Sequence, residues 1–274
     1  KNYKSINLDL IYGLPLQTRQ SFRNTIKNVI ALAPDRICLY NYGHRPEIWK
    51  HQKSIEKYEL PNIYDKTAIS LEAIDNILDS GYERIGIDHF AKKTDDLAKA
   101  KEKNSINRIF NGYSPGRTKD LLSFGLSSTS SFNNYYSQNV STELEYYNRI
   151  DSGKFPILRG CILNQDDLIR RTVINTIITE FFLDFNDIDT KCNINSREYF
   201  KYEINLLGSF IQDDIVTLNK NNLTITSIGK NFVQHVCKIF DRYWLGGEEG
   251  IGEGQIRPPW KQKAKTPTTT LEMV

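Results

Sequence analysis

Cysteine and histidine are scarce in this sequence, and neither residue is spaced as a metal site requires. The 274 residues include four cysteines and four histidines. Cys38, Cys161, Cys192 and Cys237 are far apart, so the chain contains no CxxC or CxxxCxxC metal motif. Most of them lie in apolar patterns, where a thiol packs as a small hydrophobic group. This use of cysteine predicts a reducing compartment, so we expect a cytoplasmic protein.

Long apolar runs and a strong excess of charge are also missing. No segment approaches the roughly 20 consecutive apolar residues that cross a membrane, and no signal-peptide pattern is recognisable. The net charge of +3 is slight, so it does not indicate nucleic acid and is compatible with an anionic small molecule. With 39% hydrophobic and 25% charged residues, the chain can bury a core in one large domain or two medium ones.

The N-terminal third alternates between strand-like and helix-like patterns. Strand-like runs occupy residues 7–12, 36–41 and 84–88. Between them, helical periodicity predicts one helix that Thr18 caps and a second helix at residues 64–80 that Gly81 ends. This alternation is typical of a parallel α/β sheet, in which ligand-binding groups gather at the carboxyl ends of the strands.

Asp9 is the most unusual residue of the first strand, because it interrupts an apolar run. Burying a carboxylate is costly unless hydrogen-bond donors surround it. Asp9 therefore either has a structural partner or accepts hydrogen bonds from ligand hydroxyl groups, and both interpretations stay open at this point. Because a core strand lies so close to residue 1, which is Lys rather than Met, we expect the chain to begin within a domain.

Polar residues follow each predicted strand at the point where it ends. Gln17 follows the first strand, His44 and Arg45 follow the second, and Asp88 and His89 complete the third region. We expect all of them at one edge of the sheet. His44 and Arg45 either bind a carboxylate or phosphate or form a solvated loop. Asp88 and His89 are suited to acid–base work beside an anionic substrate or, less readily, to a metal site.

The second half of the chain predicts a smaller module. A run of small residues at 121–132 would let the backbone approach a ligand closely. Asn164 is predicted to cap a helix at 166–182. Further helices are predicted at residues 196–208 and 227–243, with a hairpin of strands 215–218 and 223–226 between them. This order resembles a winged helix, but its helices mix acidic and basic residues, which favours a packing or lid role over DNA binding.

These patterns divide the chain into three parts. Residues 1–155 form the α/β domain, residues 156–244 form the helical, winged-helix-like domain, and residues 245–274 form a tail. The tail is rich in Gly, Lys, Pro and Thr, so it is predicted to be disordered. Its glycines at 250, 252 and 254 are not a nucleotide-binding loop, because no strand precedes them and prolines follow.

Four sequence blocks around the candidate residues resemble a known enzyme family. The blocks are LDLIYGLPLQT at residues 8–18, YNYGHRP at 40–46, GIDHFA at 86–91 and FNGY at 110–113. They are similar to successive blocks of the oxygen-independent coproporphyrinogen III oxidases of the radical S-adenosylmethionine (SAM) superfamily, and the likeness extends over residues 5–243. It implies the C-terminal half of a radical SAM, TIM-like partial barrel followed by a small helical, winged-helix-like domain.

The resemblance also implies an activity. Enzymes of this family use a [4Fe–4S] cluster and two SAM molecules to decarboxylate two propionates of coproporphyrinogen III, which yields protoporphyrinogen IX for haem biosynthesis. An electron donor and an electron acceptor are then implied as partners. We expect a cytoplasmic monomer that binds neither a membrane nor nucleic acid. The rival interpretations are a haem-binding chaperone of the same superfamily and a winged-helix nucleic-acid binder.

The resemblance assigns cofactor contacts to four residues. Asp9 matches an aspartate that contacts the second SAM molecule, and Gly43 stands where the family commonly has Ala at a backbone contact to it. Thr129 stands near the first molecule, where Ile is frequent, and Asn111 stands close to the cofactors, where Gln is frequent. For the substrate we expect His44, Arg45 and His89 as contacts. The candidate cationic partners for the propionates are Arg45, Arg117 and Arg159.

One departure from the family concerns the cluster. The family's CxxxCxxC motif precedes the equivalent of Asp9, and this sequence has no such motif. The cluster ligands implied by the resemblance are therefore missing. We expect the chain to be a C-terminal part of the enzyme that is inactive by itself.

Overall fold

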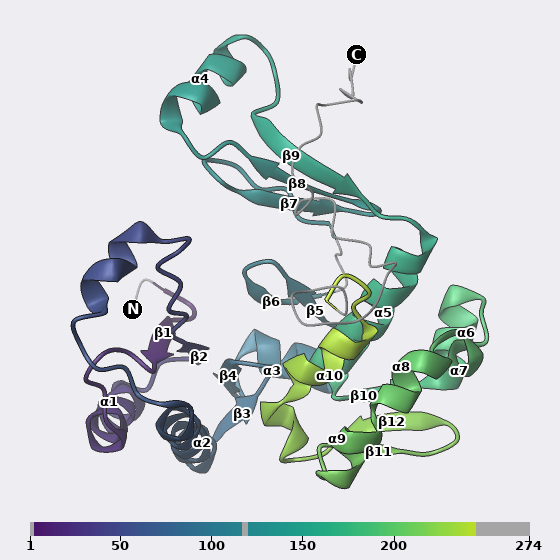
Figure 1. Ribbon diagram of the computed structural model, residues 1–274, viewed down its shortest axis with the longest axis horizontal. Helices are drawn as coiled ribbons and strands as arrows, with labels where there is room; N and C mark the ends of the chain where they lie inside the picture. The colour runs from purple at the N-terminus through teal and green to yellow at the C-terminus, as the bar shows by residue number, and fades with distance from the viewer. Residues whose placement is uncertain (1–2, 117–119, 245–274) are drawn as a thin grey trace. The chain divides into compact units, whose positions relative to one another are not determined.

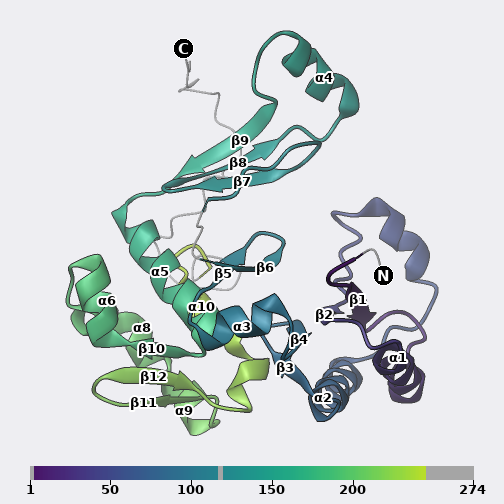
Figure 2. The same cartoon turned by 180° about the vertical axis from the view of Figure 1, so that it is seen from behind.

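The computed structural model describes residues 3–116 and 120–244 (Figures 1 and 2). The chain divides into two compact units, Lys1–Arg117 and Thr118–Val274, here called unit 1 and unit 2. The predicted boundary near residue 155 stays a prediction, and the predicted disorder of 245–274 lies outside the described residues. In the described ranges, the helices are too short or too polar to cross a membrane.

Unit 1 is built on a four-stranded sheet with the order β1-β2-β4-β3. Its elements are β1 (Asn7–Tyr12), α1 (Arg19–Leu32), β2 (Arg36–Asn41), the 3-10 helix η1 (Lys50–Ile55), α2 (Ile63–Asp79), β3 (Tyr82–Arg84), β4 (His89–Lys92), α3 (Asp96–Glu102), β5 (Ile106–Ile109) and β6 (Gly112–Pro115). The predicted strands at 7–12 and 36–41 and the two helices that follow them are confirmed. Thr18 caps α1 in a capping box with Ser21, and Gly81 follows the end of α2 with φ +86°.

The helices α1 and α2 lie side by side against one face of the sheet (Figures 1 and 2). A hydrophobic core lies between the two helices and the sheet, and Leu8, Leu10 and Tyr12 of β1 pack against it. The buried members of this core are Phe22, Ile26, Val29, Ile37, Leu39, Ile69, Ala73, Ile74, Ile77, Tyr82 and Phe90. Because successive side chains of a strand point to opposite faces, the other residues of β1 lie on the far side of the sheet.

Asp9 is therefore exposed, and the expectation of a buried carboxylate was wrong. The run of residues 7–12 looks continuously apolar apart from Asp9, but it alternates between a half-buried face and an exposed face. Asn7, Asp9 and Ile11 occupy the exposed face. Asp9 therefore bears little of the desolvation cost that a buried carboxylate would carry.

The expectation of a third parallel strand at 84–88 was also wrong. β1 and β2 are parallel, but β4 pairs antiparallel with both β2 and β3. At the reversal, the Arg84 side chain donates from Nε to the Gly86 carbonyl at 3.0 Å and from Nη2 to the Ile87 carbonyl at 2.8 Å. These bonds hold the turn between β3 and β4. Asp88 still lies beside β2, since its carbonyl accepts from the Leu39 amide at 2.8 Å.

A hairpin of β5 and β6, which the sequence patterns did not reveal, completes unit 1. Two glycines allow it to pack closely. A Cβ at Gly86 would overlap the Tyr113 ring of β6, and a Cβ at Gly112, where φ is +129°, would lie 2.5 Å from His89 Nε2. The hydroxyl of Tyr113 accepts a hydrogen bond from the Ile87 amide at 2.9 Å. The hairpin is thus fixed against the turn that precedes β4.

Unit 2 contains two three-stranded sheets, β7-β8-β9 and β10-β12-β11. Its elements are β7 (Thr129–Phe132), β8 (Tyr135–Asn139), α4 (Glu143–Asp151), β9 (Ile157–Ile162), α5 (Gln165–Glu180), β10 (Phe182–Asp184), α6 (Phe185–Cys192), α7 (Ser196–Tyr199), α8 (Lys201–Leu206), α9 (Gly208–Gln212), β11 (Val216–Leu218), β12 (Asn222–Ile225), the 3-10 helix η2 (Gly229–Asn231) and α10 (Val233–Phe240). The first sheet was not predicted. The cap of α5 at Asn164 and the hairpin β11–β12 are confirmed.

Two predicted helices of unit 2 are interrupted. The helix expected at 196–208 is divided into α7, α8 and α9, and the breaks fall at Phe200 and Leu207, both fully buried. The helix expected at 227–243 is divided into η2 and α10, and at η2 Gly229 lies so close to the Ile215 carbonyl that a Cβ would overlap it. In both cases contacts with distant parts of the unit override the local helical pattern.

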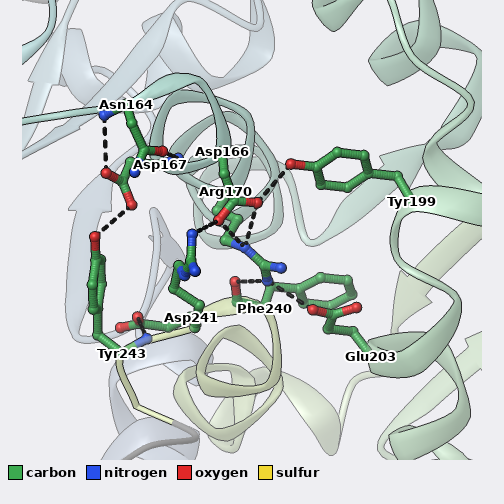
Figure 3. Close-up of polar contacts among 10 residues, drawn as sticks. Asn164, Asp166, Asp167, Arg170, Tyr199, Glu203, Phe240, Asp241 and Tyr243 are labelled. Atoms are coloured by element: carbon green, nitrogen blue, oxygen red, sulfur yellow. Dashed lines mark hydrogen bonds and ion pairs between the residues drawn. The ribbon is translucent and has the colours of Figure 1, made fainter. Parts of the chain in front are cut away.

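A network of charged side chains joins α5 to α8 and to the end of α10 (Figure 3). Arg170 donates from Nε to Asp166 at 2.9 Å and from Nη1 to Glu203 at 2.8 Å. Its Nη1 also donates to the carbonyl of Phe240 at 3.0 Å. Glu203 is only 5% exposed, and Arg170 supplies the charged partner of its side chain. Removing one partner of such a buried pair leaves an uncompensated charge.

Asp166 is the second acceptor of this network. The Tyr199 hydroxyl donates to it at 2.6 Å, and Arg242 Nη1 donates to it at 2.7 Å. Burial acts to raise the pKa of Asp166, but the bond from Tyr199 and the charges of Arg170 and Arg242 outweigh burial, so this pKa lies below its usual value. The stability that Asp166 contributes is therefore present above the pKa of an unfolded Asp, about 3.9, and is lost as the pH falls through the lower folded value.

Gly86→Ala should destabilise unit 1, because the new methyl group would overlap Tyr113. We expect the free energy of unfolding to fall by about 1–3 kcal/mol, the usual cost of overpacking, measured as a lower urea midpoint by circular dichroism. Gly43→Ala is the matched control, since a Cβ there meets nothing within 4 Å. Equal midpoints for the two variants would contradict the described packing.

Asp166→Asn should destabilise unit 2 at pH 7 by about 1–3 kcal/mol, the cost of weakening charge-assisted hydrogen bonds. The difference between wild type and variant should shrink as the pH falls from 5 to below the folded pKa of Asp166. Urea unfolding across this pH range measures the difference in unfolding free energy. Asp213→Asn, at an exposed position, is the control. If the difference between wild type and Asp166→Asn did not depend on pH, the contribution of the Asp166 charge to stability would be refuted.

Candidate functional site

The face of the four-stranded sheet opposite α1 and α2 carries polar side chains. We call Asn7, Asp9, Cys38, Tyr40 and His89 the polar face. The register places Asp9 opposite Cys38, and Cys38 opposite His89. Directly opposed residues of neighbouring strands share a face. The two predicted site residues Asp9 and His89 therefore belong to one row across β1, β2 and β4, which the sequence patterns alone did not indicate.

Asn7 links the members of this row. Its Nδ2 donates to Asp9 Oδ1 at 2.6 Å, and its Oδ1 accepts from the Cys38 thiol at 3.2 Å. Burial raises the pKa of Cys38 to about 12, and the Asp9 carboxylate contributes to the shift. Burial, together with Cys38, Asp9 and Asp88, likewise raises the pKa of Tyr40. At neutral pH the polar face thus holds a neutral thiol and a neutral phenol beside a carboxylate.

Asp88 and His89 form the pair that the sequence suggested. His89 is 7% exposed, and its Nδ1 lies 2.6 Å from Asp88 Oδ1. The His89 ring contacts Tyr113 and Tyr40 edge to face, at centroid distances of 5.1 and 6.2 Å. An aspartate that accepts from Nδ1–H fixes the orientation of an imidazole, and the other ring nitrogen, Nε2, faces Gly112.

Arg108 of β5 is a polar residue of this region that the sequence analysis missed. Its Nη1 lies 3.9 Å from Asp88 Oδ1, and its guanidinium lies 4.8 Å from the centre of the Tyr113 ring. Nη1 is buried and has no hydrogen-bond partner among the described residues. A buried donor without an acceptor is costly, so an acceptor supplied by a bound ligand or water would stabilise this region. No motif marks Arg108 in the sequence, because its environment comes from a hairpin contact.

The segment 42–45 follows the carboxyl end of β2, and the buried Gln52 of η1 holds it in place. Gln52 Oε1 accepts from the Arg45 amide at 2.6 Å, and Gln52 Nε2 donates to the Gly43 carbonyl at 3.1 Å. His44 lies between the Tyr42 hydroxyl, at 3.2 Å from Nδ1, and the Glu56 carboxylate, at 3.9 Å from Nε2. The backbone of the segment is therefore held by hydrogen bonds, while the Arg45 side chain is exposed.

The remaining predicted residues occupy separate places. Asn111 is exposed at the turn between β5 and β6, next to Gly112, which packs on His89. Thr129 begins β7 in unit 2, where its carbonyl accepts from Ser123 Oγ at 2.7 Å. Arg159 is exposed on β9 and donates to the Gln138 side chain. Arg117 lies outside the described residues.

The cysteines do not fit an iron–sulfur cluster. A cluster needs several thiolates around one centre, whereas in the two described ranges no three His, Cys, Asp or Glu side chains gather in a group that could hold a metal ion. Burial raises the pKa of Cys38 and of Cys237 to about 12, which opposes formation of thiolates. Asp9, by contrast, is an exposed carboxylate and fits the hydroxyl groups of a nucleoside.

Gln52→Met should release segment 42–45, because it removes both hydrogen bonds from the side chain. We expect exchange of the Arg45 amide hydrogen to accelerate about tenfold, as the loss of one hydrogen bond implies, measured by NMR. Lys53→Met, at an exposed neighbour on η1, is the control. Unchanged exchange in a folded Gln52→Met variant would show that Gln52 does not hold the segment.

No protein-family model matches the sequence, but individual relatives do. An oxygen-independent coproporphyrinogen III oxidase from Pseudomonas aeruginosa is 41% identical over 241 residues, which cover 88% of this chain and 52% of that protein. One from Thermostichus vulcanus is 36% identical and is covered over 74% of its length. The chain spans about half the length of most of the curated relatives it matches.

A solved structure agrees with these relatives. Coproporphyrinogen III oxidase (HemN) from Escherichia coli, described as a radical SAM enzyme, matches with a TM-score of 0.83 and 37% identity. The match covers 88% of this chain and 56% of the other. It confirms the expected fold class, with sheets that are open rather than closed into a barrel. On this evidence the chain belongs to the oxygen-independent coproporphyrinogen III oxidase family.

Proposed function

We propose that these residues form part of an oxygen-independent coproporphyrinogen III oxidase that uses radical SAM chemistry. The reaction would convert two propionates of coproporphyrinogen III to vinyl groups, with loss of carbon dioxide, and yield protoporphyrinogen IX. The observation that carries the proposal is the exposed Asp9 carboxylate on the polar face of a chain from this family. An electron donor and an electron acceptor are its further partners, and the four cysteines, none in a disulfide, favour the reducing cytoplasm.

In this proposal two SAM molecules bind near residues of this chain. Asp9 accepts hydrogen bonds from hydroxyl groups of the second molecule, and the backbone of Gly43 contacts it. Gly43 supports this role because it faces open space, since a Cβ there would meet nothing within 4 Å. Asn111 lies close to the cofactors and Thr129 near the first molecule. When bound, the cofactors supply the radical chemistry, while protein groups orient the reactants.

The cluster requires ligands other than the four cysteines of this chain, for the reasons of spacing and pKa given above. Within the proposal, the 274 residues by themselves are therefore inactive. What they supply is a polar face and an edge of the sheet that orient the cofactor and the substrate.

His44, Arg45 and His89 are the proposed contacts to the anionic substrate. Arg45 is exposed, and a guanidinium matches the two oxygens of a propionate carboxylate. His44 is oriented by Tyr42 and Glu56, and His89 is oriented by Asp88. Oriented imidazoles can donate to a carboxylate or hold a proton beside it.

The function can be tested by exchanging segments with the Escherichia coli relative. A chimera in which the matched part of that enzyme is replaced by this chain should convert coproporphyrinogen III to protoporphyrinogen IX anaerobically, because this chain would supply the missing half of the site. Product is measured by fluorescence after oxidation. A chimera with an intact cluster spectrum but no product would contradict the proposal.

Asp9→Asn within the chimera should lower the rate at least tenfold, because an amide cannot replace both acceptor oxygens of the carboxylate. Asp75→Asn, at an exposed position on α2, is the matched control and should leave the rate unchanged. Equal rates for the two variants would remove Asp9 from the site while leaving the proposed reaction standing.

A further inference from the structure

Lys66 of α2 reaches the edge of the sheet where β1 and β2 end. Its Nζ donates to the carbonyl of Tyr42, at 3.4 Å, a long distance for a hydrogen bond. Tyr42 is also tied to β1, because its amide donates to the Tyr12 carbonyl at 2.8 Å. The ammonium group therefore lies at the carboxyl ends of both strands, directly before Gly43.

The Lys66 side chain passes close to Gly13. A Cβ at Gly13 would lie 2.8 Å from Lys66 Cε and 3.2 Å from its Cδ. The φ of Gly13 is +83°, and its amide donates to Gln17 Oε1 at 2.6 Å. The positive φ explains why glycine stands in the turn after β1, and the half-buried lysine packs against this turn.

No charged partner in the described ranges stabilises the ammonium group of Lys66. Among the described residues, none of the ion pairs involves Lys66. Lys66 also lies in the first turns of α2, where Asn62 is the N-cap. A positive charge near a helix N-terminus is unfavourable. An ammonium with three donors and one long bond to a carbonyl has unused capacity to bind an anion.

We infer that Lys66 is a carboxylate-binding residue of the candidate site. The inference rests on the proposed function, which supplies two sources of this chemistry: the carboxylate of the methionine moiety of SAM, and the propionates of the porphyrinogen. The ammonium group forms a charge-assisted hydrogen bond with the carboxylate at the edge formed by Gly13, Tyr42 and Gly43. This replaces the long bond to the Tyr42 carbonyl and balances the charge of Lys66.

The test compares ligands with and without a carboxylate on the intact chain. SAM is paired with S-methyl-5′-thioadenosine, which lacks the amino-acid moiety, and coproporphyrin III is paired with its tetramethyl ester in the same solvent. Lys66→Met should weaken binding of one carboxylate ligand about tenfold or more and leave its carboxylate-free partner unchanged. The ligand that weakens identifies the source. Isothermal titration measures SAM binding, and fluorescence measures porphyrin binding.

Three further variants complete the experiment. Lys66→Arg keeps a positive charge and should retain most of the wild-type affinity. Lys66→Gln should show the same loss of affinity and replaces Lys66→Met if that variant folds poorly. Lys27→Met, at an exposed lysine of α1, is the control and should leave the affinity for every ligand unchanged. If the wild type binds a carboxylate ligand and a folded Lys66→Met or Lys66→Gln variant binds it equally, the inference is overturned while the proposed function stands. If the wild type binds neither carboxylate ligand, the proposed cofactor and substrate contacts of this chain fail, and the inference fails with them.

Discussion

The packing of α1 and α2 against one face of the four-stranded sheet determines where the polar groups of unit 1 lie. Leu8 and Leu10 must point toward the helices to complete the apolar core. Since side chains alternate along a strand, Asp9 must point to the opposite face. A slip of one residue would expose the leucines and bury the carboxylate, which makes the register strongly specified. The hydrophobic effect in the core thus positions the carboxylate without any direct contact.

The same constraint explains why the chemistry of unit 1 gathers at one face and one edge. The parallel pairing of β1 with β2 brings their carboxyl ends together, and the antiparallel β4 starts beside β2. His89 therefore joins the polar face from a strand of the opposite direction, and Asp88 precedes it at the start of β4. The loops beyond the strands gain their shape from single side chains, such as Gln52 at segment 42–45 and Arg84 at the turn before β4. Helix and sheet hydrogen bonds end where the elements end, so these side-chain contacts hold the loops in place.

Local signals made part of this structure predictable. Thr18 and Asn164 cap helices through bonds to residues three positions away, so their roles can be recognised in a short window of sequence. The contacts that escaped prediction join residues far apart, such as Arg108 with Asp88 or Arg170 with Glu203. Breaks at Phe200 and Leu207 escaped for the same reason, because burial against distant residues overrides helical periodicity. Blocks such as residues 86–91 identified the family although the strand predicted there was wrong.

Most buried charged groups of the described residues are matched by partners in the chain, and two groups of unit 1 are not. In unit 2 the charges of Asp166, Arg170 and Glu203 are matched by one another and by neighbouring donors, which is how a buried network contributes to a stable structure. In unit 1 the Arg36–Asp95 pair is matched in the same way, but the described residues give Lys66 one long bond to a carbonyl and leave Arg108 Nη1 without a hydrogen-bond partner. Departures of this kind are expected at functional or strained sites. A ligand that supplied acceptors to these two groups, as the proposed function requires, would complete them, while the network of unit 2 has the character of a structural support.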